Sequence, residues 1–313
     1  MSRDLVSVII PFKERFGKVE RALKSVEAQT YKNVEVILVN DASEKEFNID
    51  INSFGFNITY LPLLKNVGPG GARNAGLEKS KGEYIAFLDS DDYWQPEFLE
   101  KAIAVHSETN DLAFVYSFTR IINNGNDDGL RKDGVICRTI LPDLFKSGRP
   151  WSTSSCLWTR STVDKVGGYL NTRCWEDYDF DIRAAIVKNE IRCISEPLTN
   201  YEIAGNENLS SQPLAIGLTW KAQSLLNISK VLRDSIFRET PSIFGNFLNS
   251  YLGNAAQLVD IGNFDQARVN LDEIGKWSIM SKPSIAIAKL LTIGKLKVSS
   301  RFIRNLKYMV NIN

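Results

Sequence analysis

The chain has 313 residues, 38 of them basic and 37 acidic, for a formal net charge of +1. A nearly neutral chain has no general attraction to polyanions, so we expect no nucleic-acid partner. The single histidine, His106, excludes a metal site built on a histidine cluster. The four cysteines form no C-x-x-C pair and are expected to be reduced thiols of a cytoplasmic protein.

The first hundred residues alternate between apolar runs and segments with helical spacing. The runs that predict strands are residues 5–11, 34–41, 58–64 and 84–92, and those that predict helices are 17–30, 68–82 and 96–107. Such alternation predicts an α/β fold, with a parallel sheet covered by helices on both faces. Ligands of such sheets bind at the carboxyl ends of the strands, where Pro11, Asp41 and the acids of residues 89–92 fall.

The pattern becomes weaker after residue 110. Residues 112–122 and 154–159 predict two further strands, and the polar residues 123–134 predict a turn. From about residue 214 the strand signals stop and helical spacing takes over. We therefore expect a first domain over residues 1–212 and a helical region over residues 213–313.

The sequence Asp89-Ser90-Asp91-Asp92 follows an apolar run directly. Neighbouring carboxylates repel one another and raise one another's pKa, so a bound cation is expected to offset the repulsion. Carboxylate oxygens suit Mg²⁺ or Mn²⁺, which also bind the phosphates of a nucleotide. The alternative is an acidic loop in which Asp92 caps the next helix. The position at a strand end favours the metal site.

Residues 66–77, NVGPGGARNAGL, are typical of a backbone that approaches a ligand closely. The helix that follows the glycines offers free N–H groups to an anion, and Arg73 on its first turn could bond a phosphate or a base carbonyl. The segment matches neither G-x-G-x-x-G nor a Walker loop. A glycine turn followed by a surface arginine is the alternative.

A second acidic run lies within residues 174–185, CWEDYDFDIRAA. Acids at the start of a helix are stabilised by the helix dipole, which suits Asp179 and Asp181. Glu176 and Asp177 directly follow Trp175, and a partly apolar pocket would raise the pKa of a carboxylate toward a value useful for a general base. Both interpretations stay open from the residues alone.

No acidic residue follows Glu273, whereas basic residues alternate with apolar ones to the end of the chain. The basic residues are Lys276, Lys282, Lys289, Lys295, Lys297, Arg301, Arg304 and Lys307. The favoured interpretation is a terminal helix with a solvated basic face. The alternative is peripheral contact with anionic lipid at the inner face of the plasma membrane. No segment reaches the roughly 18 apolar residues of a spanning helix.

Three segments, in this order, resemble the family 2 glycosyltransferases: residues 6–43, 66–92 and 165–183. The similarity extends over roughly residues 5–205. It implies a GT-A fold, a Rossmann-like and mostly parallel sheet with flanking helices, to which the C-terminal helical region is appended. It also implies that a sugar is transferred with inversion from a nucleoside diphosphate donor, with UDP favoured, and that Mg²⁺ or Mn²⁺ is required.

The resemblance assigns the donor site to the carboxyl ends of the strands. The residues expected to bind the nucleotide are Pro11, Lys13, Glu14, Asp41, Gly71, Arg73, Asp89 and Ser90. Asp41 would hydrogen-bond the base, typically uracil, and Arg73 would contact the base or the diphosphate. Asp91 would ligate the metal directly, with Asp89 beside it.

The resemblance also identifies Asp177 as the catalytic base, with Glu176 beside it. The residues expected to line the acceptor side are Trp151, Ser154, Gly168 and Tyr169. Many relatives carry a histidine, which helps to bind the diphosphate or the metal, where this chain has Ala204 and Gly205. This departure affects the expected affinity for the metal.

The expected enzyme is a hexosyl- or N-acetylhexosaminyl-transferase acting on a sugar or lipid-linked sugar in surface-polysaccharide or glycolipid assembly. One alternative is a nucleotide-sugar-binding protein with little or no turnover. Another is a nucleotidyltransferase on a similar sheet. The absence of a glycine-rich loop after the first strand, where PFKERFG stands, argues against the latter.

Overall fold

The computed structural model describes residues 4–109, 111–172, 174–203, 214–239, 241–274, 276 and 303. The chain divides into two compact units. The first comprises Met1–Asn171 with Ala184–Asn208, and the second comprises Thr172–Arg183 with Leu209–Asn313. Residues 172–183, which carry the candidate base, therefore group with the C-terminal helices, and the expected boundary at residue 212 stays a prediction.

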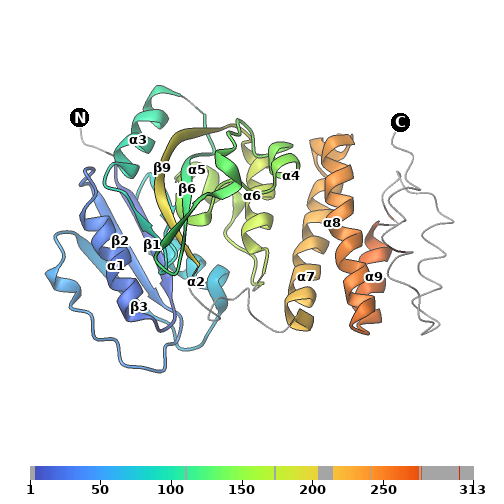
Figure 1. Cartoon of the computed structure of the whole chain (residues 1–313), viewed down its shortest axis with the longest axis horizontal. Helices are drawn as coiled ribbons and strands as arrows, with labels where there is room; N and C mark the ends of the chain where they lie inside the picture. Colours follow the sequence, from blue (N-terminus) through green and yellow to red (C-terminus); the bar gives the residue numbers. More distant parts are fainter. Residues whose placement is uncertain are drawn as a thin grey trace. The chain divides into compact units, whose positions relative to one another are not determined.

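The first unit is built on one mixed sheet (Figure 1). Its strands are β1 (Val6–Phe12), β2 (Val34–Asn40), β3 (Asn57–Pro62), β4 (Tyr84–Phe87), β5 (Tyr93–Trp94), β6 (Phe114–Asn123), β7 (Asn126–Leu130), β8 (Cys156–Thr159) and β9 (Ile191–Ile203). They lie in the order β3-β2-β1-β4-β8-β6-β9-β5, with β7 beside β6. The strands β3, β2, β1 and β4 are parallel, whereas β8 is antiparallel to both β4 and β6. The predicted α/β class is confirmed.

Helices cover both faces of the parallel strands. The helices of this unit are α1 (Phe16–Glu27), α2 (Gly68–Leu77), α3 (Phe98–Glu108), α4 (Asp143–Ser147) and α5 (Arg160–Val166). Val8 and Ile10 of β1 share a buried cluster with residues of α1 and α3, such as Val19. Ile9 points to the opposite face, where a Cβ on Gly76 of α2 would lie 2.4 Å from its Cγ2. Because side chains alternate along a strand, a continuously apolar strand is buried on both faces.

Part of the sheet differs from the sequence-based expectation. The polar residues 123–134 were expected as a turn, but β7 forms within them and pairs with β6, with Asn126 opposite Asn123. β9 was not predicted, and it runs parallel to β6 along most of its length. β9 matters for the site because its carboxyl end carries Glu202.

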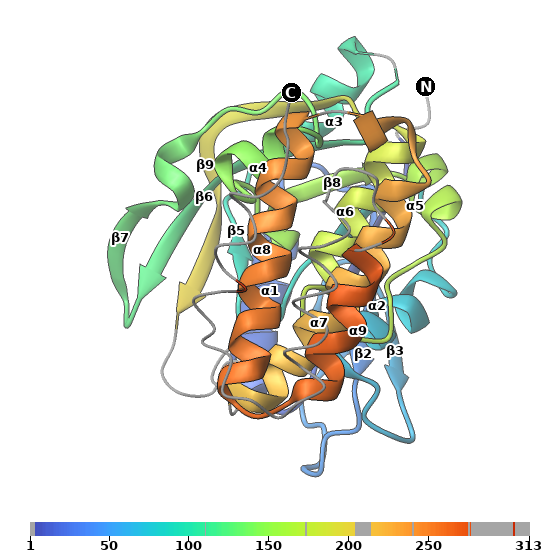
Figure 2. The ribbon, with the colours of Figure 1, turned by 90° about the vertical axis from the view of Figure 1, so that its right-hand side faces the viewer.

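In the part of the second unit that the structure describes, the helices α7 (Leu214–Arg233), α8 (Pro241–Asp260) and α9 (Phe264–Ile274) pack together (Figure 2). The helix α6 (Glu176–Val187) begins in this unit and ends in the first. Gly262, with φ +79°, forms the turn between α8 and α9. The predicted C-terminal helices are confirmed. Within the described residues, no helix has the length and apolar character needed to cross a membrane.

Candidate active site

Three parallel strands end side by side at one edge of the sheet. β1 pairs in parallel with both β2 and β4. Just past the strand ends, the N–H of Asp41 donates to the carbonyl of Phe12 over 2.7 Å, and the N–H of Leu88 donates to the carbonyl of Ile9 over 3.0 Å. Asp41 and the acids of residues 89–92 therefore emerge at the same edge, where ligands of α/β sheets bind.

Asp41 fastens the glycine-rich segment to this edge. Its Oδ1 accepts the N–H of Val67 at 2.7 Å, and its Oδ2 accepts the N–H of Gly68 at 3.0 Å and the Nδ2 of Asn66 at 2.8 Å. The first N–H groups of a helix have no partners within the helix, and the helix dipole favours a negative charge beside them. Asp41, directly after β2, thus caps the N-terminus of α2, and its predicted contact with a base stays a prediction.

Arg73 of α2 is buried between the acidic run and an aromatic ring. Its Nη2 lies 2.7 Å from Oδ1 of Asp89, and its guanidinium lies 5.1 Å from the ring centroid of Tyr169. Asn74 holds Tyr169 in place, because its Nδ2 donates to the carbonyl of Tyr169 at 2.8 Å and its Oδ1 accepts the N–H of Tyr169 at 2.7 Å. Gly168 has φ +87°, and a Cβ there would lie 2.7 Å from Oδ1 of Asn74, so this approach requires glycine.

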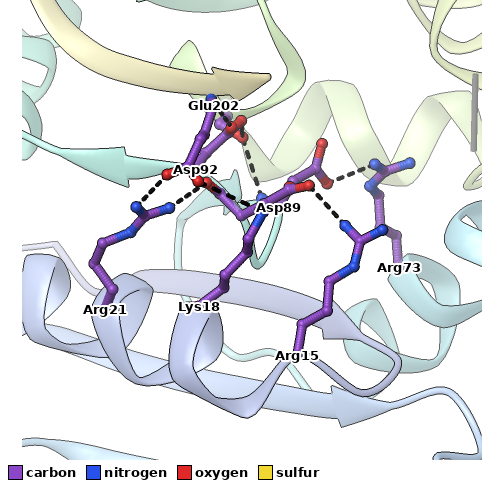
Figure 3. Close-up of polar contacts among 9 residues, drawn as sticks. Arg15, Lys18, Arg21, Arg73, Asp89, Asp92 and Glu202 are labelled. Carbon is purple, nitrogen blue, oxygen red and sulfur yellow. Dashed lines mark hydrogen bonds and ion pairs between the residues drawn. The ribbon is translucent and has the colours of Figure 1, made fainter. Parts of the chain in front are cut away.

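Asp89 and Asp91 are paired with arginines but remain partly accessible, with 29% and 22% of their side chains exposed. Oδ2 of Asp91 accepts Nη1 of Arg15 at 3.1 Å. Burial, followed by the charge of Asp89, raises the pKa of Asp91, while Arg15 and Lys18 lower it. The two carboxylates are therefore held in place by cations and remain partly exposed. Figure 3 shows the pair formed by Asp89 and Arg73.

Asp92 has a different environment, because its side chain is 1% exposed. It accepts hydrogen bonds from the hydroxyl of Ser154 and, at 3.3 Å, from the N–H of Glu202. Burial, together with the charges of Asp91 and Asp89, raises the pKa of Asp92 well above its ordinary value, and the hydroxyl of Ser154 opposes this shift. Asp92 therefore links the acidic run to the segment before β8 and to β9.

Three cations that the sequence analysis missed extend from one side of α1 toward this cluster (Figure 3). Arg15 bonds Asp91, and Lys18 lies 3.6 Å from Oε1 of Glu202. Arg21 pairs with Glu202 and donates from Nη2 to the carbonyl of Asp91 at 2.7 Å. The spacing of three residues in R-x-x-K-x-x-R could have indicated a common face, but a charged helix face is normally solvated.

The loops after β1 and β2 are joined through Glu14. Its N–H donates to Oγ of Ser43 at 2.9 Å, and its Oε1 accepts the N–H of Glu44 at 2.6 Å. Glu14 and Arg15 have φ values of +57° and +60°, in the left-handed region that side chains rarely adopt. Such strain, held by surrounding contacts, is typical of functional loops.

The other predicted nucleotide-binding residues differ in burial and in position. Pro11 is buried within β1, Lys13 is exposed just after it, and Ser90 is half-buried within the acidic run. Gly71 lies in the first turn of α2, where a Cβ would approach the side chain of Val67 to 2.8 Å. Their predicted contacts with a nucleotide stay predictions.

Two of the predicted acceptor-side residues are fully buried. Trp151 packs against Phe114 and Tyr116, with ring centroids 5.3 and 5.5 Å apart. Ser154 directs its hydroxyl to Asp92 and its carbonyl to Nε1 of Trp94 at 2.7 Å. Ser154 therefore supports the acidic run, whereas Trp151 packs against β6, and acceptor contact stays a prediction for both.

The donor set at Asp89 and Asp91 fits a hard divalent ion. Both supply carboxylate oxygens, and both are partly accessible. Among the residues that the structure describes, no three acidic, cysteine or histidine side chains converge on a preformed metal site. This suits Mg²⁺ or Mn²⁺ held by one or two carboxylates, with the remaining positions filled by water and substrate phosphates.

The predicted base lies at the start of α6, in the second unit. Glu176 is buried, whereas Asp177 is half-buried and its Oδ1 accepts the N–H of Tyr178 at 2.9 Å. The preceding segment is held by α7, because Oγ of Ser224 donates to the carbonyl of Cys174 at 2.7 Å. The helical region therefore contributes directly to the placement of the candidate base.

Two further predictions lie mostly outside the described residues. Ala204 and Gly205, which stand where many relatives have a histidine, lie outside the described residues. Of the basic C-terminal residues, Lys276 is described, and its Nζ lies 2.8 Å from Oε2 of Glu273. The proposed contact of the remaining basic residues with lipid stays a prediction.

Two relatives are similar to this chain in sequence. An uncharacterized glycosyltransferase of Rickettsia felis is 30% identical over 270 residues, which cover 85% of this chain and 43% of the relative. The UDP-Glc:alpha-D-GlcNAc-diphosphoundecaprenol beta-1,3-glucosyltransferase WfgD of Escherichia coli is 33% identical over 155 residues, which cover 44% of this chain and 60% of WfgD. The chain spans only 33% to 43% of the length of the first Rickettsia relatives that it matches.

The fold also matches a solved structure over nearly its whole length. The structure of S. aureus TarS 1–349 in complex with UDP-GlcNAc superposes with a TM-score of 0.77 and 20% identity, covering 96% of this chain and 91% of TarS. In sequence, the model for Glycosyl transferase family 2 matches residues 7–168, about half of the chain. The chain therefore belongs to glycosyltransferase family 2 and has the GT-A fold.

Proposed function

We propose that the protein is an inverting glycosyltransferase that moves a sugar from a UDP-sugar to a hydroxyl of a sugar or lipid-linked sugar acceptor. The observation that carries this proposal is the common sheet edge where Asp41, Arg73, Asp89 and Asp91 meet. The name of WfgD, a UDP-Glc transferase for a lipid-linked sugar, and UDP-GlcNAc in TarS support the donor and acceptor classes. Surface-polysaccharide or glycolipid assembly is the corresponding process.

The nucleotide would lie along this edge. The base would face the loops joined through Glu14 and Asp41, and Glu14 keeps a buried oxygen, Oε2, without a hydrogen-bond partner among the described residues. Such an oxygen suits the ring N–H that uracil and guanine both carry. Arg73, fixed by Asp89 and Tyr169, would donate to the diphosphate without large reorganisation.

Asp91, with Asp89, would hold Mg²⁺ or Mn²⁺ next to the diphosphate. When bound, the ion would stabilise the negative charge that develops on the leaving diphosphate. Arg73 and Arg15 would add positive charge on the protein side of the same site.

Asp177 would act as the general base. It would take the proton of the acceptor hydroxyl while that oxygen bonds the anomeric carbon and the bond to the diphosphate breaks. One displacement at the anomeric carbon inverts its configuration and needs no covalent enzyme intermediate. Glu176, buried beside it, would help to orient the acceptor.

The test measures nucleotide release in the absence of acceptor, when water replaces the acceptor hydroxyl. Purified protein with Mn²⁺ is incubated with UDP-Glc, UDP-GlcNAc, UDP-Gal or GDP-Man, and the released UDP or GDP is quantified. We expect slow release from one UDP-sugar. Asp177→Asn should reduce the rate by about 10²–10⁴-fold, as expected for loss of a general base, and leave donor affinity unchanged.

The matched control is Asp164→Asn, which changes an aspartate that is 61% exposed and should behave as wild type. Donor binding without release in wild type would favour the alternative of a nucleotide-sugar-binding protein. Equal rates for wild type and Asp177→Asn would contradict the assignment of the base.

A further inference from the structure

Among the described residues, cations of the chain itself pair with three of the four acids of this cluster, Asp89, Asp91 and Glu202. The charged residues at the cluster are the acids Asp89, Asp91, Asp92 and Glu202 and the cations Arg15, Lys18, Arg21 and Arg73 (Figure 3). A divalent ion that arrives alone would meet carboxylates whose charge is already balanced. A diphosphate that arrives alone would meet cations that are already paired. The charges of the site therefore favour binding of the divalent ion and the diphosphate together over binding of either one alone.

The cations differ in what they hold. Lys18 and Arg21 pair with the carboxylate of Glu202, at the end of β9. Arg73 is 5% exposed and fixed between Asp89 and Tyr169. Arg15 alone of these four pairs with the carboxylate of Asp91, the predicted metal ligand, and its side chain is 25% exposed, so it can move toward solvent or a ligand.

The backbone also favours a specific role for Arg15. It stands at the N-cap position of α1 with φ +60°, directly after Glu14 with φ +57°. Glycine would adopt this conformation more easily, yet the chain places two charged side chains there. The strained turn directs Arg15 to Asp91 from the start of a helix, whose dipole favours an incoming anion.

We propose that Arg15 is an exchangeable counter-ion of the donor site. It pairs with Asp91 while the site is free, and it moves to the donor's diphosphate when a divalent ion takes its place on Asp91. This inference rests on the proposed function. Its consequence is that Arg15 opposes binding of the metal alone, favours binding of the nucleotide, and makes the binding of each promote the binding of the other.

The test compares wild type with Arg15→Gln in two separate titrations. Free Mn²⁺ is followed by electron paramagnetic resonance with protein alone, and UDP and GDP are titrated by calorimetry at saturating Mn²⁺. Removal of one charge a few ångströms away at a partly exposed site should change affinity by about five- to tenfold. Arg15→Gln should bind Mn²⁺ about five- to tenfold more tightly and the nucleotide more weakly by a similar factor.

Two control variants separate this role from a loss of structure. Arg15→Lys keeps the charge and should stay close to wild type in both titrations. Lys24→Gln changes a cation on the same helix that is 65% exposed and paired with Glu20, and it should alter neither affinity. Thermal unfolding of each variant confirms that the fold is intact.

Opposite shifts in the two affinities are the expected result, because a general structural defect would weaken both. Parallel shifts or no shift in Arg15→Gln, with nucleotide binding to wild type intact, would overturn the role of Arg15 and leave the proposed function standing. Failure of folded wild type to bind either UDP or GDP, with or without Mn²⁺, would overturn both.

Discussion

The single histidine offers a sharp test of how α3 packs on the sheet. His106 is 7% exposed, its Nε2 lies 2.9 Å from the carbonyl of Leu157, and its ring lies 4.9 Å from that of Tyr84. Burial, with a smaller contribution from the charge of Lys188, lowers the pKa of His106 from 6.5 to about 4, while the carbonyl opposes the shift. The native state should therefore keep this ring neutral where the unfolded chain is protonated.

The sign and size of the effect on stability follow from this shift. Between pH 6.5 and 4 the unfolded chain binds a proton at His106 that the native state does not, so the free energy of unfolding falls as the pH falls through this range. The full shift corresponds to about 3 kcal/mol, of which about 2 kcal/mol is lost between pH 7 and 5. Above pH 6.5 the contribution of this group is constant.

Chemical denaturation of wild type and His106→Gln at pH 7 and pH 5 isolates this contribution, because the glutamine amide can still donate to Leu157 and does not titrate. Wild type should lose about 2 kcal/mol more than the variant on acidification. The imidazole signal in an NMR titration, free of overlap from other histidines, should not move above pH 5. An imidazole that titrates near pH 6.5, or equal losses in the two proteins, would refute the described packing of α3.

Two further predictions concern packing near the site. Gly76→Ala should lower the free energy of unfolding by about 1–3 kcal/mol, because its Cβ would lie 2.4 Å from Cγ2 of Ile9. Gly17→Ala in α1 should instead raise the free energy of unfolding by up to about 1 kcal/mol, because no atom lies within 4 Å of the added Cβ. Denaturant titration checks the pair, and equal effects would contradict the close approach of α2. Ser154→Ala removes the hydroxyl that donates to buried Asp92 and should cost about 1–3 kcal/mol in the same assay. An unchanged midpoint would show that this hydrogen bond does not support the acidic run.

The parallel half of the fold was predictable because its signals are local. Continuously apolar strands such as β1 are buried on both faces, and Asp41 and Asp89 follow the ends of such strands. The common edge then follows from parallel pairing alone. The resemblance to family 2 glycosyltransferases added the predicted function of each site residue. The family itself is confirmed by the match over residues 7–168.

The other parts of the fold and of the site depend on contacts between residues far apart in the sequence, which no local pattern encodes. β7 consists of NDDGL, which has no apolar alternation and forms through backbone pairing with β6. The hydrogen bond between Ser154 and Asp92 joins residues 62 positions apart, so no local pattern indicated that Ser154 supports the acids, and its predicted place on the acceptor side stays a prediction. Arg15, at the N-cap of α1, was missed because a charge at a helix end is normally solvated, whereas here it pairs with Asp91.

The central claim is that the acids of residues 89–92 serve a metal ion and a nucleoside diphosphate. The most direct measurement is calorimetric titration of UDP and GDP into wild type, Asp91→Ala and the control Asp128→Ala, with Mn²⁺ and with a chelator. Asp128 is exposed on β7, so its replacement should change nothing. The account predicts Mn²⁺-dependent binding of one nucleotide, UDP, that is retained in Asp128→Ala and lost in Asp91→Ala. Binding of neither nucleotide to folded wild type, with or without Mn²⁺, would contradict it.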